Sequence, residues 1–189
     1  MSAKWRPAFN HGLRGDLGTV AGVIAGAEEC HNDRGWDQLP PMVYVLSRTP
    51  DCRPGYLDLS ISPVNEPADL ARIAHVLETG TATERAAFDP PGDPVAHAFL
   101  AEGYRAATGV TVPPGCNLAD TVGSIECRFA VAIVGVADVL YLRRDRGRQQ
   151  EVMHTPADAG PADPLGGEYV YPGLLRVHTA ARRLHGLET

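Results

Sequence analysis

The residues of this sequence best suited to catalysis are a cysteine and an aspartate in the segment 113–120. Cys116 lies there among proline, glycine and asparagine, a composition typical of a loop. A thiol becomes a nucleophile when a neighbouring base lowers its pKa, and the candidate partners are Asp120 with His97 or His154. This set indicates a hydrolase or a transferase. In the alternative interpretation, Cys116 is a small apolar side chain in an ordered loop.

Metal and cofactor sites have recognisable spacings, and this sequence lacks them. It contains no His-Glu-x-x-His, no Cys-x-x-Cys, no Gly-x-x-x-x-Gly-Lys and no Gly-x-Ser-x-Gly. His178 and His185 are about 10.5 Å apart along a predicted helix, which is too far for both to bind one metal. We therefore predict no metal and no cofactor, and we expect these two histidines to lie at the surface.

The four cysteines, Cys30, Cys52, Cys116 and Cys127, can form two disulfides in an exported protein or remain free thiols in a reducing cytosol. The first residues of the sequence lack the apolar stretch of a secretory signal. We therefore predict four free thiols and a cytoplasmic location. Cys127 alternates with Phe129 along a predicted strand and is expected to be part of the core.

Four arginines surround one predicted β-turn: Arg143, Arg144, Arg146 and Arg148. They can form a solvated end that protects an edge strand, bind an acidic protein partner, or bind nucleic acid. All three interpretations place the side chains at the surface. Reversing the charges of Arg144 and Arg146 is therefore expected to leave the stability nearly unchanged.

Trp36 and Gln38 lie between the first predicted helix and the first predicted strand, in the sequence Gly35-Trp36-Asp37-Gln38-Leu39-Pro40. We expect the Trp36 ring to anchor this junction, with a binding role for Trp36 and Gln38 as the alternative. Together with the short apolar strand after it, this segment resembles a conserved family of actinobacterial proteins, in which proline is usual at the position of Leu39. The resemblance implies a bacterial origin and a cytosolic setting, and it implies no activity.

The first predicted helix, 16–30, carries glycine at every fourth position of one face: Gly18, Gly22 and Gly26. Each glycine destabilises a helix interior by about 1 kcal/mol relative to alanine. This cost indicates that a second backbone approaches the stripe closely, either inside the fold or across a homodimer. Glycines tolerated in a well-packed helix are the alternative. Replacing Gly22 by leucine is accordingly expected to destabilise the fold or to dissociate a dimer.

These side chains are positioned by a predicted order of helix, two strands, two helices, three strands and helix. The predicted helices are 16–30, 66–79, 93–108 and one that begins at Pro172; the predicted strands are 42–47, 56–62, 124–133, 138–143 and 149–154. The alternation of 56–62 places Leu57, Leu59 and Ile61 toward the core. No strand–helix–strand repeat occurs, so we predict one α+β domain over residues 1–189, with about four helices and a mostly antiparallel sheet of about five strands.

Composition restricts the function classes. The chain has 189 residues, 44% of them hydrophobic, and a formal net charge of −6, which disfavours nucleic acid and anionic membrane surfaces as partners. No apolar run approaches the ~20 residues of a membrane-spanning helix. We therefore predict a non-enzymatic cytoplasmic binding or adaptor protein with a protein partner, either immunity-protein-like or small chaperone-like. The alternatives are an enzyme that uses Cys116, Asp120 and a histidine, and a structural protein of a phage or mobile element.

Overall fold

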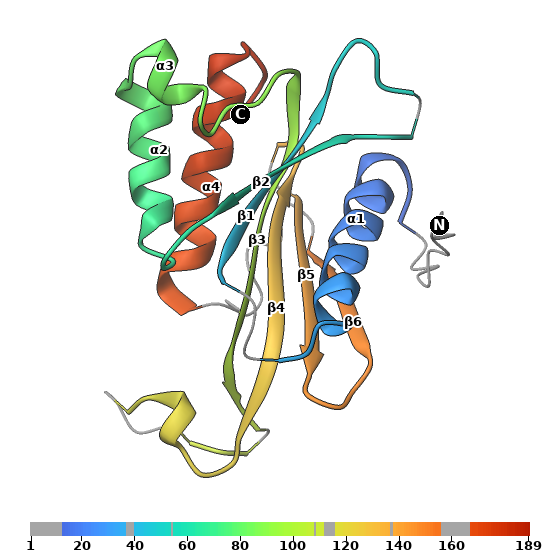
Figure 1. Cartoon of the computed structure of the whole chain (residues 1–189), viewed down its shortest axis with the longest axis vertical. Coiled ribbons are helices and arrows are strands. Elements are labelled where there is room, and N and C mark those ends of the chain that lie inside the picture. The colour runs from blue at the N-terminus through green and yellow to red at the C-terminus, as the bar shows by residue number, and fades with distance from the viewer. Residues whose placement is uncertain are drawn as a thin grey trace.

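An antiparallel sheet forms the centre of the molecule, with helices on both of its faces (Figure 1). The computed structural model describes residues 13–36, 40–53, 55–107, 109–111, 116–136, 138–155 and 167–189. The helices in these ranges are α1 (Gly15–Asn32), α2 (Asp69–Thr79), α3 (Ala82–Arg85) and α4 (Gly167–Leu184), with a 3-10 turn at Leu118–Asp120. The strands are β1 (Met42–Arg48), β2 (Asp58–Pro63), β3 (Asp93–Ala106), β4 (Ser124–Val134), β5 (Asp138–Asp145) and β6 (Gln150–Thr155). The predicted α+β class is confirmed.

The strands follow the order β2-β1-β3-β4-β5-β6 across the sheet, and every neighbouring pair is antiparallel. The predicted hairpin is formed by β1 and β2, in which Tyr44 pairs with Ile61. The predicted meander is formed by β4, β5 and β6. Both predictions are confirmed, because apolar runs of strand length bounded by turn residues specify these strands locally.

Strand β3 occupies the segment 93–108 that we predicted as a helix, and that prediction is wrong. The segment is rich in alanine and also contains leucine and glutamate, which are good helix formers. In the fold it lies between β1 and β4, and residues 94–101 are buried in succession. A strand covered on both faces shows no alternation, so its sequence does not differ from that of a buried helix.

The helices differ from the predicted ones in their bounds, and α1 extends from Gly15 to Asn32 in place of 16–30. α2 begins three residues later than predicted, and α4 begins five residues before Pro172, which lies inside it. The predicted loop 79–91 contains the one-turn helix α3, which Thr81 and Glu84 cap reciprocally. None of the helices in the described part of the chain has the length and apolar character needed to span a bilayer.

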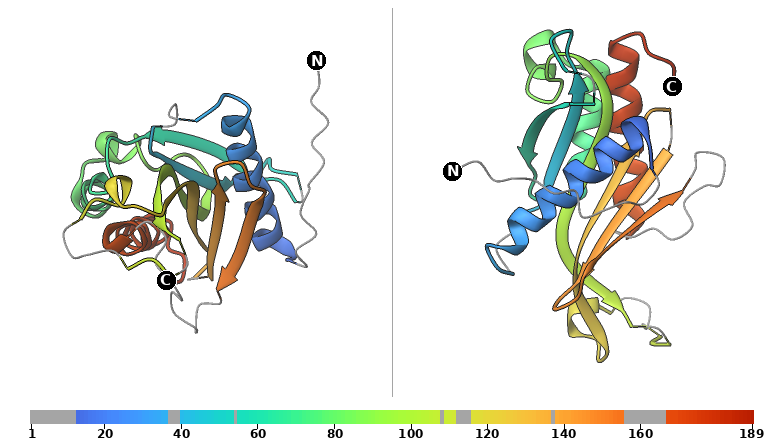
Figure 2. Two further views of the ribbon diagram at one scale, coloured as in Figure 1. Left: turned by 90° about the horizontal axis from the view of Figure 1, so that it is seen from below. Right: turned by 90° about the vertical axis from the view of Figure 1, so that its right-hand side faces the viewer.

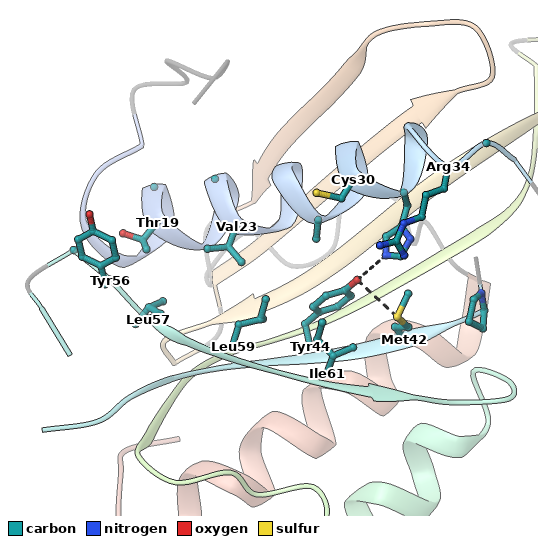
Figure 3. Close-up of a pocket in the computed structure, with 17 residues that line it drawn as sticks. Thr19, Val23, Cys30, Arg34, Met42, Tyr44, Tyr56, Leu57, Leu59 and Ile61 are labelled. Carbon is teal, nitrogen blue, oxygen red and sulfur yellow. Dashed lines mark hydrogen bonds between the residues drawn. The ribbon is translucent and has the colours of Figure 1, made fainter. Parts of the chain in front are cut away.

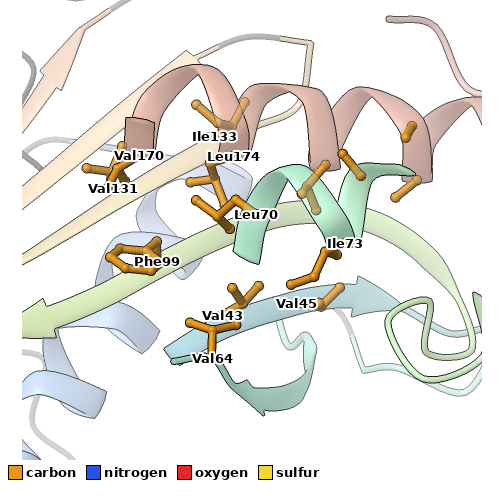
Figure 4. Packing of buried hydrophobic residues seen from close by; sticks show 14 of the residues in the cluster. Val43, Val45, Val64, Leu70, Ile73, Phe99, Val131, Ile133, Val170 and Leu174 are labelled. Carbon is orange, nitrogen blue, oxygen red and sulfur yellow. The ribbon is translucent and has the colours of Figure 1, made fainter. Parts of the chain in front are cut away.

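One face of the sheet is covered by α2 and α4 together. Leu70 and Ile73 of α2 and Leu174 of α4 pack on Phe99 and other apolar side chains of the sheet (Figure 4). Gly173 allows the two helices to approach closely, since a Cβ atom there would lie 2.9 Å from the Leu70 Cβ. This face is therefore closed by a pair of helices.

In the described part of the chain, α1 is the only helix that covers the opposite face of the sheet (Figure 2). Val20 and Ile24 of α1 pack among Ala98 of β3 and Leu140 of β5. The contacts of α1 with the sheet are mainly with β3, β4 and β5. Among the described residues, no helix lies above the β2 end of this face.

Candidate functional site

A groove of about 1050 Å³ lies between α1 and the β1–β2 end of the sheet (Figure 3). Side chains of β1 and β2 form its floor, and one side of α1 forms its wall. Most of the lining is apolar, and it includes Val23, Ala27, Met42, Leu57, Leu59 and Ile61. Ligand sites in proteins are typically concave, mostly apolar and about 300–1,000 Å³ in volume. The groove is therefore the candidate site.

Strand β2 contributes the exposed part of the groove floor. Its alternation places Leu59 and Ile61 on the α1 side of the sheet, but the expectation that they enter the core is wrong. Leu59 is 42% exposed and Ile61 is 52% exposed, and Tyr56 beside them is 66% exposed. Because α1 lies over β3, β4 and β5, nothing in the described part of the chain covers these side chains.

The middle of α1 has no polar face. Residues 17–27 contain no charged side chain, although a helix at a protein surface normally carries a polar side. Gly18 and Gly22 line the groove, whereas Gly26 is buried. The expected close approach of a second backbone inside the fold occurs at Gly18, where a Cβ atom would lie 2.8 Å from the carbonyl oxygen of Leu13. It does not occur at Gly22, where a Cβ atom would meet no atom within 4 Å. Close packing of this stripe across a homodimer stays a prediction.

Polar groups gather at the end of the groove near the C-terminus of α1. The Tyr44 hydroxyl lies 3.3 Å from His31 Nε2 and donates to Met42 Sδ at 3.9 Å. Burial raises the pKa of Tyr44 to about 12, so the phenol keeps its proton. Burial, and then the charge of Arg34, lower the pKa of His31, so its ring is neutral at pH 7. Arg34 is exposed and forms no ion pair among the described residues, and it is the one cationic side chain in the described lining of the groove.

A buried charge network holds the C-terminal half of α1 on the sheet. The guanidinium of Arg128 is fully buried; its Nη2 donates to Glu102 Oε1 at 2.6 Å, and its Nη1 lies 3.7 Å from Glu28 Oε1. Arg144 Nε donates to the other oxygen of Glu28 at 2.9 Å. The guanidinium carbon of Arg128 lies 4.5 Å from the centroid of the Trp36 ring. This contact agrees with the predicted anchoring role of Trp36, and its alternative role in binding stays a prediction. The network fixes the wall of the groove.

The arginines of the β5–β6 turn interact within the chain. Arg143, Arg144 and Arg146 form ion pairs with glutamates on β6, α1 and β4, respectively. The Arg148 carbonyl oxygen accepts a hydrogen bond from Arg144 Nη1 at 3.5 Å. The expectation that Arg144 is exposed is wrong: its side chain is 12% accessible and contacts the buried carboxylate of Glu28. Charge reversal at Arg144 should therefore destabilise the fold, and binding of an acidic partner or nucleic acid here stays a prediction.

The structure does not assemble the predicted catalytic set. Cys116 is exposed and lies beside the 3-10 turn that contains Asp120. His97 is buried in β3, and the 3-10 turn contacts this strand. His97 lies nine residues before the last residue of β3, Ala106, which corresponds to about 30 Å along the strand. His154 Nε2 lies 3.2 Å from Asp138 Oδ1 at another place in the sheet. Neither histidine is therefore placed to activate the thiol of Cys116.

His178 of α4 and His185, which directly follows the helix, have different environments. His178 is fully buried, so the expectation of a surface pair is wrong; its Nδ1 lies 2.9 Å from Nδ1 of His97. His185 Nε2 lies 3.0 Å from Asp89 Oδ1. Among the described residues, no group of three or more His, Cys, Asp or Glu side chains is placed to hold a metal ion.

Apart from Gly18 and Gly22, which were predicted as close-packing or homodimer contacts, the residues of the groove were not among the predicted site residues, although the sequence contains one signal for them. A helix whose residues 17–27 lack charge needs an apolar partner on more than one side. The alternation of β2 does not predict the groove, because it shows which side chains share a face of the sheet and not whether another element covers that face. The position of α1 over β3, β4 and β5 leaves Leu59 and Ile61 exposed.

Comparisons with known proteins add no functional information. No protein-family model, no curated protein and no solved structure matches this chain. The resemblance of the segment 35–40 to an actinobacterial family therefore stays a prediction. Gln38, which belongs to that segment, lies outside the described residues, and its predicted binding role also stays a prediction.

Proposed function

We propose that this chain is a non-enzymatic binding or adaptor protein that holds an apolar segment of a protein partner in the α1–β2 groove. The observation that carries the proposal is the exposure of Tyr56, Leu59 and Ile61 along one groove. Contiguous exposed apolar surface of this kind marks interaction sites in proteins. Immunity-protein-like and small chaperone-like proteins both act through such a surface.

The energetic argument follows from the area that a partner would cover. Full burial of a leucine or isoleucine side chain contributes about 1.5–3 kcal/mol. Leu59 and Ile61 are about half exposed, so a partner that covers both gains a substantial part of that energy. This gain in burial free energy requires no catalytic group. It therefore agrees with the separation of Cys116 from His97 and His154.

Affinity capture from the host organism with charged groove variants tests this function. We expect the wild-type chain to retain a protein partner, and Ile61→Asp to reduce its recovery by at least about tenfold, because a carboxylate in the interface would be desolvated. The melting temperature should stay nearly unchanged, since the Ile61 side chain is half exposed in the free protein.

The matched control for this experiment is Val122→Asp. Val122 is also an exposed apolar residue, 94% accessible, but it does not line the groove. It should retain the partner at the wild-type level. Equal recovery of the same proteins by wild type and Ile61→Asp would show that the groove is not the binding surface.

We also propose a cytoplasmic setting, and the state of the cysteines tests it. All four cysteines are free thiols in the structure. Native alkylation should modify Cys30, Cys52 and Cys116, whereas Cys127 should react only after unfolding, because burial raises its pKa to about 11. Mass spectrometry of protein alkylated at harvest and then unfolded should find four modifications. Two fewer would reveal a disulfide and contradict the cytoplasmic proposal.

A further inference from the structure

The α1–β2 groove has the shape and the charge to bind one particular kind of segment. We infer that its occupant is an amphipathic α-helix of the partner protein, which lies beside α1 and places an acidic residue next to Arg34. This inference rests on the proposed function, and it names the form of the partner that the groove accepts.

The layers formed by the described residues leave room for one further helix beside α1. On one face of the sheet, α2 and α4 lie side by side and cover the sheet together. On the other face, α1 covers β3, β4 and β5 and leaves Leu59 and Ile61 of β2 exposed. Neighbouring helices pack about 8–10 Å apart, so one further helix beside α1 would cover β2 and complete this layer.

The dimensions of the groove agree with a helix. Its lining runs along α1 from Gly18 to His31, which corresponds to about 20 Å, or about 13 residues of a bound helix. The floor consists of side chains such as Tyr44, Leu59 and Ile61. An extended peptide is normally held by the backbone groups of a strand edge. β2 is an edge strand of the described sheet and borders the groove, but the floor of the groove itself consists of side chains.

The glycines of α1 allow the bound helix to approach closely. Gly18 and Gly22 are one helical turn apart on the groove side, and no atom lies within 4 Å of a Cβ built at Gly22. The absence of a side chain leaves the α1 backbone accessible at Gly22, whereas a Cβ atom at Gly18 would lie 2.8 Å from the carbonyl oxygen of Leu13. A helix with alanine or glycine at the facing position could pack directly against Gly22.

The positive charge of Arg34 favours an acidic residue in the bound helix. Arg34 lies at one end of the groove, is exposed and forms no ion pair among the described residues. His31 beside it is neutral at pH 7, because burial and the charge of Arg34 lower its pKa. A carboxylate of the bound helix would neutralise Arg34, and acidic residues are common in the first turn of a helix.

Selection from a library of random 16-residue displayed peptides on the full-length chain tests the inference. Peptides that also bind Ile61→Asp are removed by counter-selection. We expect the enriched sequences to repeat apolar residues at intervals of three and four, with a small residue near the middle and Asp or Glu near one end. Synthetic versions of these peptides should gain helical circular dichroism on binding.

Variants of the protein then locate each contact. Gly22→Leu should weaken peptide binding by at least about tenfold, since the leucine side chain would fill the groove. Its melting temperature should stay the same or rise, because leucine is a better helix former than glycine. Arg34→Glu should weaken binding by about three- to tenfold, and a peptide in which the acidic residue is changed to lysine should restore it.

The outcomes separate the inference from the proposed function. If the enriched peptides alternate apolar and polar residues and do not bind Ile61→Asp, the groove binds an extended strand. This result would overturn the inference of a helical occupant and would leave the proposed function standing. No enrichment on wild type relative to Ile61→Asp would overturn both proposals. A dimeric mass in light scattering that becomes monomeric in Gly22→Leu would identify a second copy of this chain as the occupant, and would likewise overturn the inference.

Discussion

Replacing Arg128 by methionine is expected to lower the free energy of unfolding by about 3–5 kcal/mol. The guanidinium of Arg128 is fully buried between the carboxylates of Glu28 and Glu102, and its Nη2 also donates to the carbonyl oxygen of Gly35. Methionine fills a similar volume but leaves Glu28, which is itself fully buried, with one compensating arginine fewer. Chemical denaturation of wild type and variant at pH 7 measures the difference.

Two further variants determine whether the loss comes from the uncompensated charge. The double variant Arg128→Met with Glu102→Leu should lose less than the sum of the two single variants, because the second change removes a carboxylate that no longer has a partner. Arg72→Met removes an exposed arginine from its ion pair with Asp69 and should leave the stability unchanged within error. A loss below about 1 kcal/mol for Arg128→Met would mean that the network does not hold α1 in place.

Stability is also expected to fall steeply between pH 6.5 and about pH 4, because two neutral histidines are buried together. His178 Nε2 lies 2.7 Å from the carbonyl oxygen of Gly135, so it carries the proton and donates. Nδ1 of His178 is then an acceptor for the Nδ1–H of His97 at 2.9 Å. Burial lowers the pKa of His178 to about 4, and burial followed by the neighbouring ring lowers the pKa of His97 well below 6.5.

The sign of the effect follows from proton uptake. Below pH 6.5 the unfolded chain binds protons at both histidines and the folded chain does not, so acid favours unfolding. The stabilisation is complete above pH 6.5 and is lost as the pH falls toward the folded pKa values. For His178 alone, the difference between 6.5 and about 4 corresponds to about 3 kcal/mol.

Denaturation curves at pH 7.5, 6, 5 and 4.5 measure this dependence. His178→Gln should reduce the slope, since the amide can still donate to Gly135 but does not titrate. His75→Gln removes an exposed histidine that does not belong to this pair and serves as the matched control. Asp145 affects stability in a different pH range. Its hydrogen bonds with Arg105 lower its pKa, so its contribution to the free energy of unfolding is lost below about pH 4. Equal stability of wild type at pH 7.5 and pH 4.5 would contradict the buried neutral pair.

Local patterns predicted most of the secondary structure of this chain. β1, β2, β4, β5 and β6 have alternating or uniformly apolar sequences of strand length between turn residues, and all five lie where the pattern placed them. α1 and α2 were found from their helical spacing and flanking residues. β3 was missed, because its burial on both faces removed the period of two and left only its alanine-rich composition.

The sequence by itself therefore determined the α+β class, the order of most elements, and the unusual lack of charge in residues 17–27 of α1. Only the tertiary structure decided how the functional side chains are used. Arg144 and Glu28 are 116 residues apart, and no local pattern records that they meet in a buried network. Leu59 and Ile61 have the alternation of core residues, yet they line a groove, because burial depends on which strands α1 covers. Pairing and coverage are long-range packing outcomes, whereas periodicity specifies only local conformation.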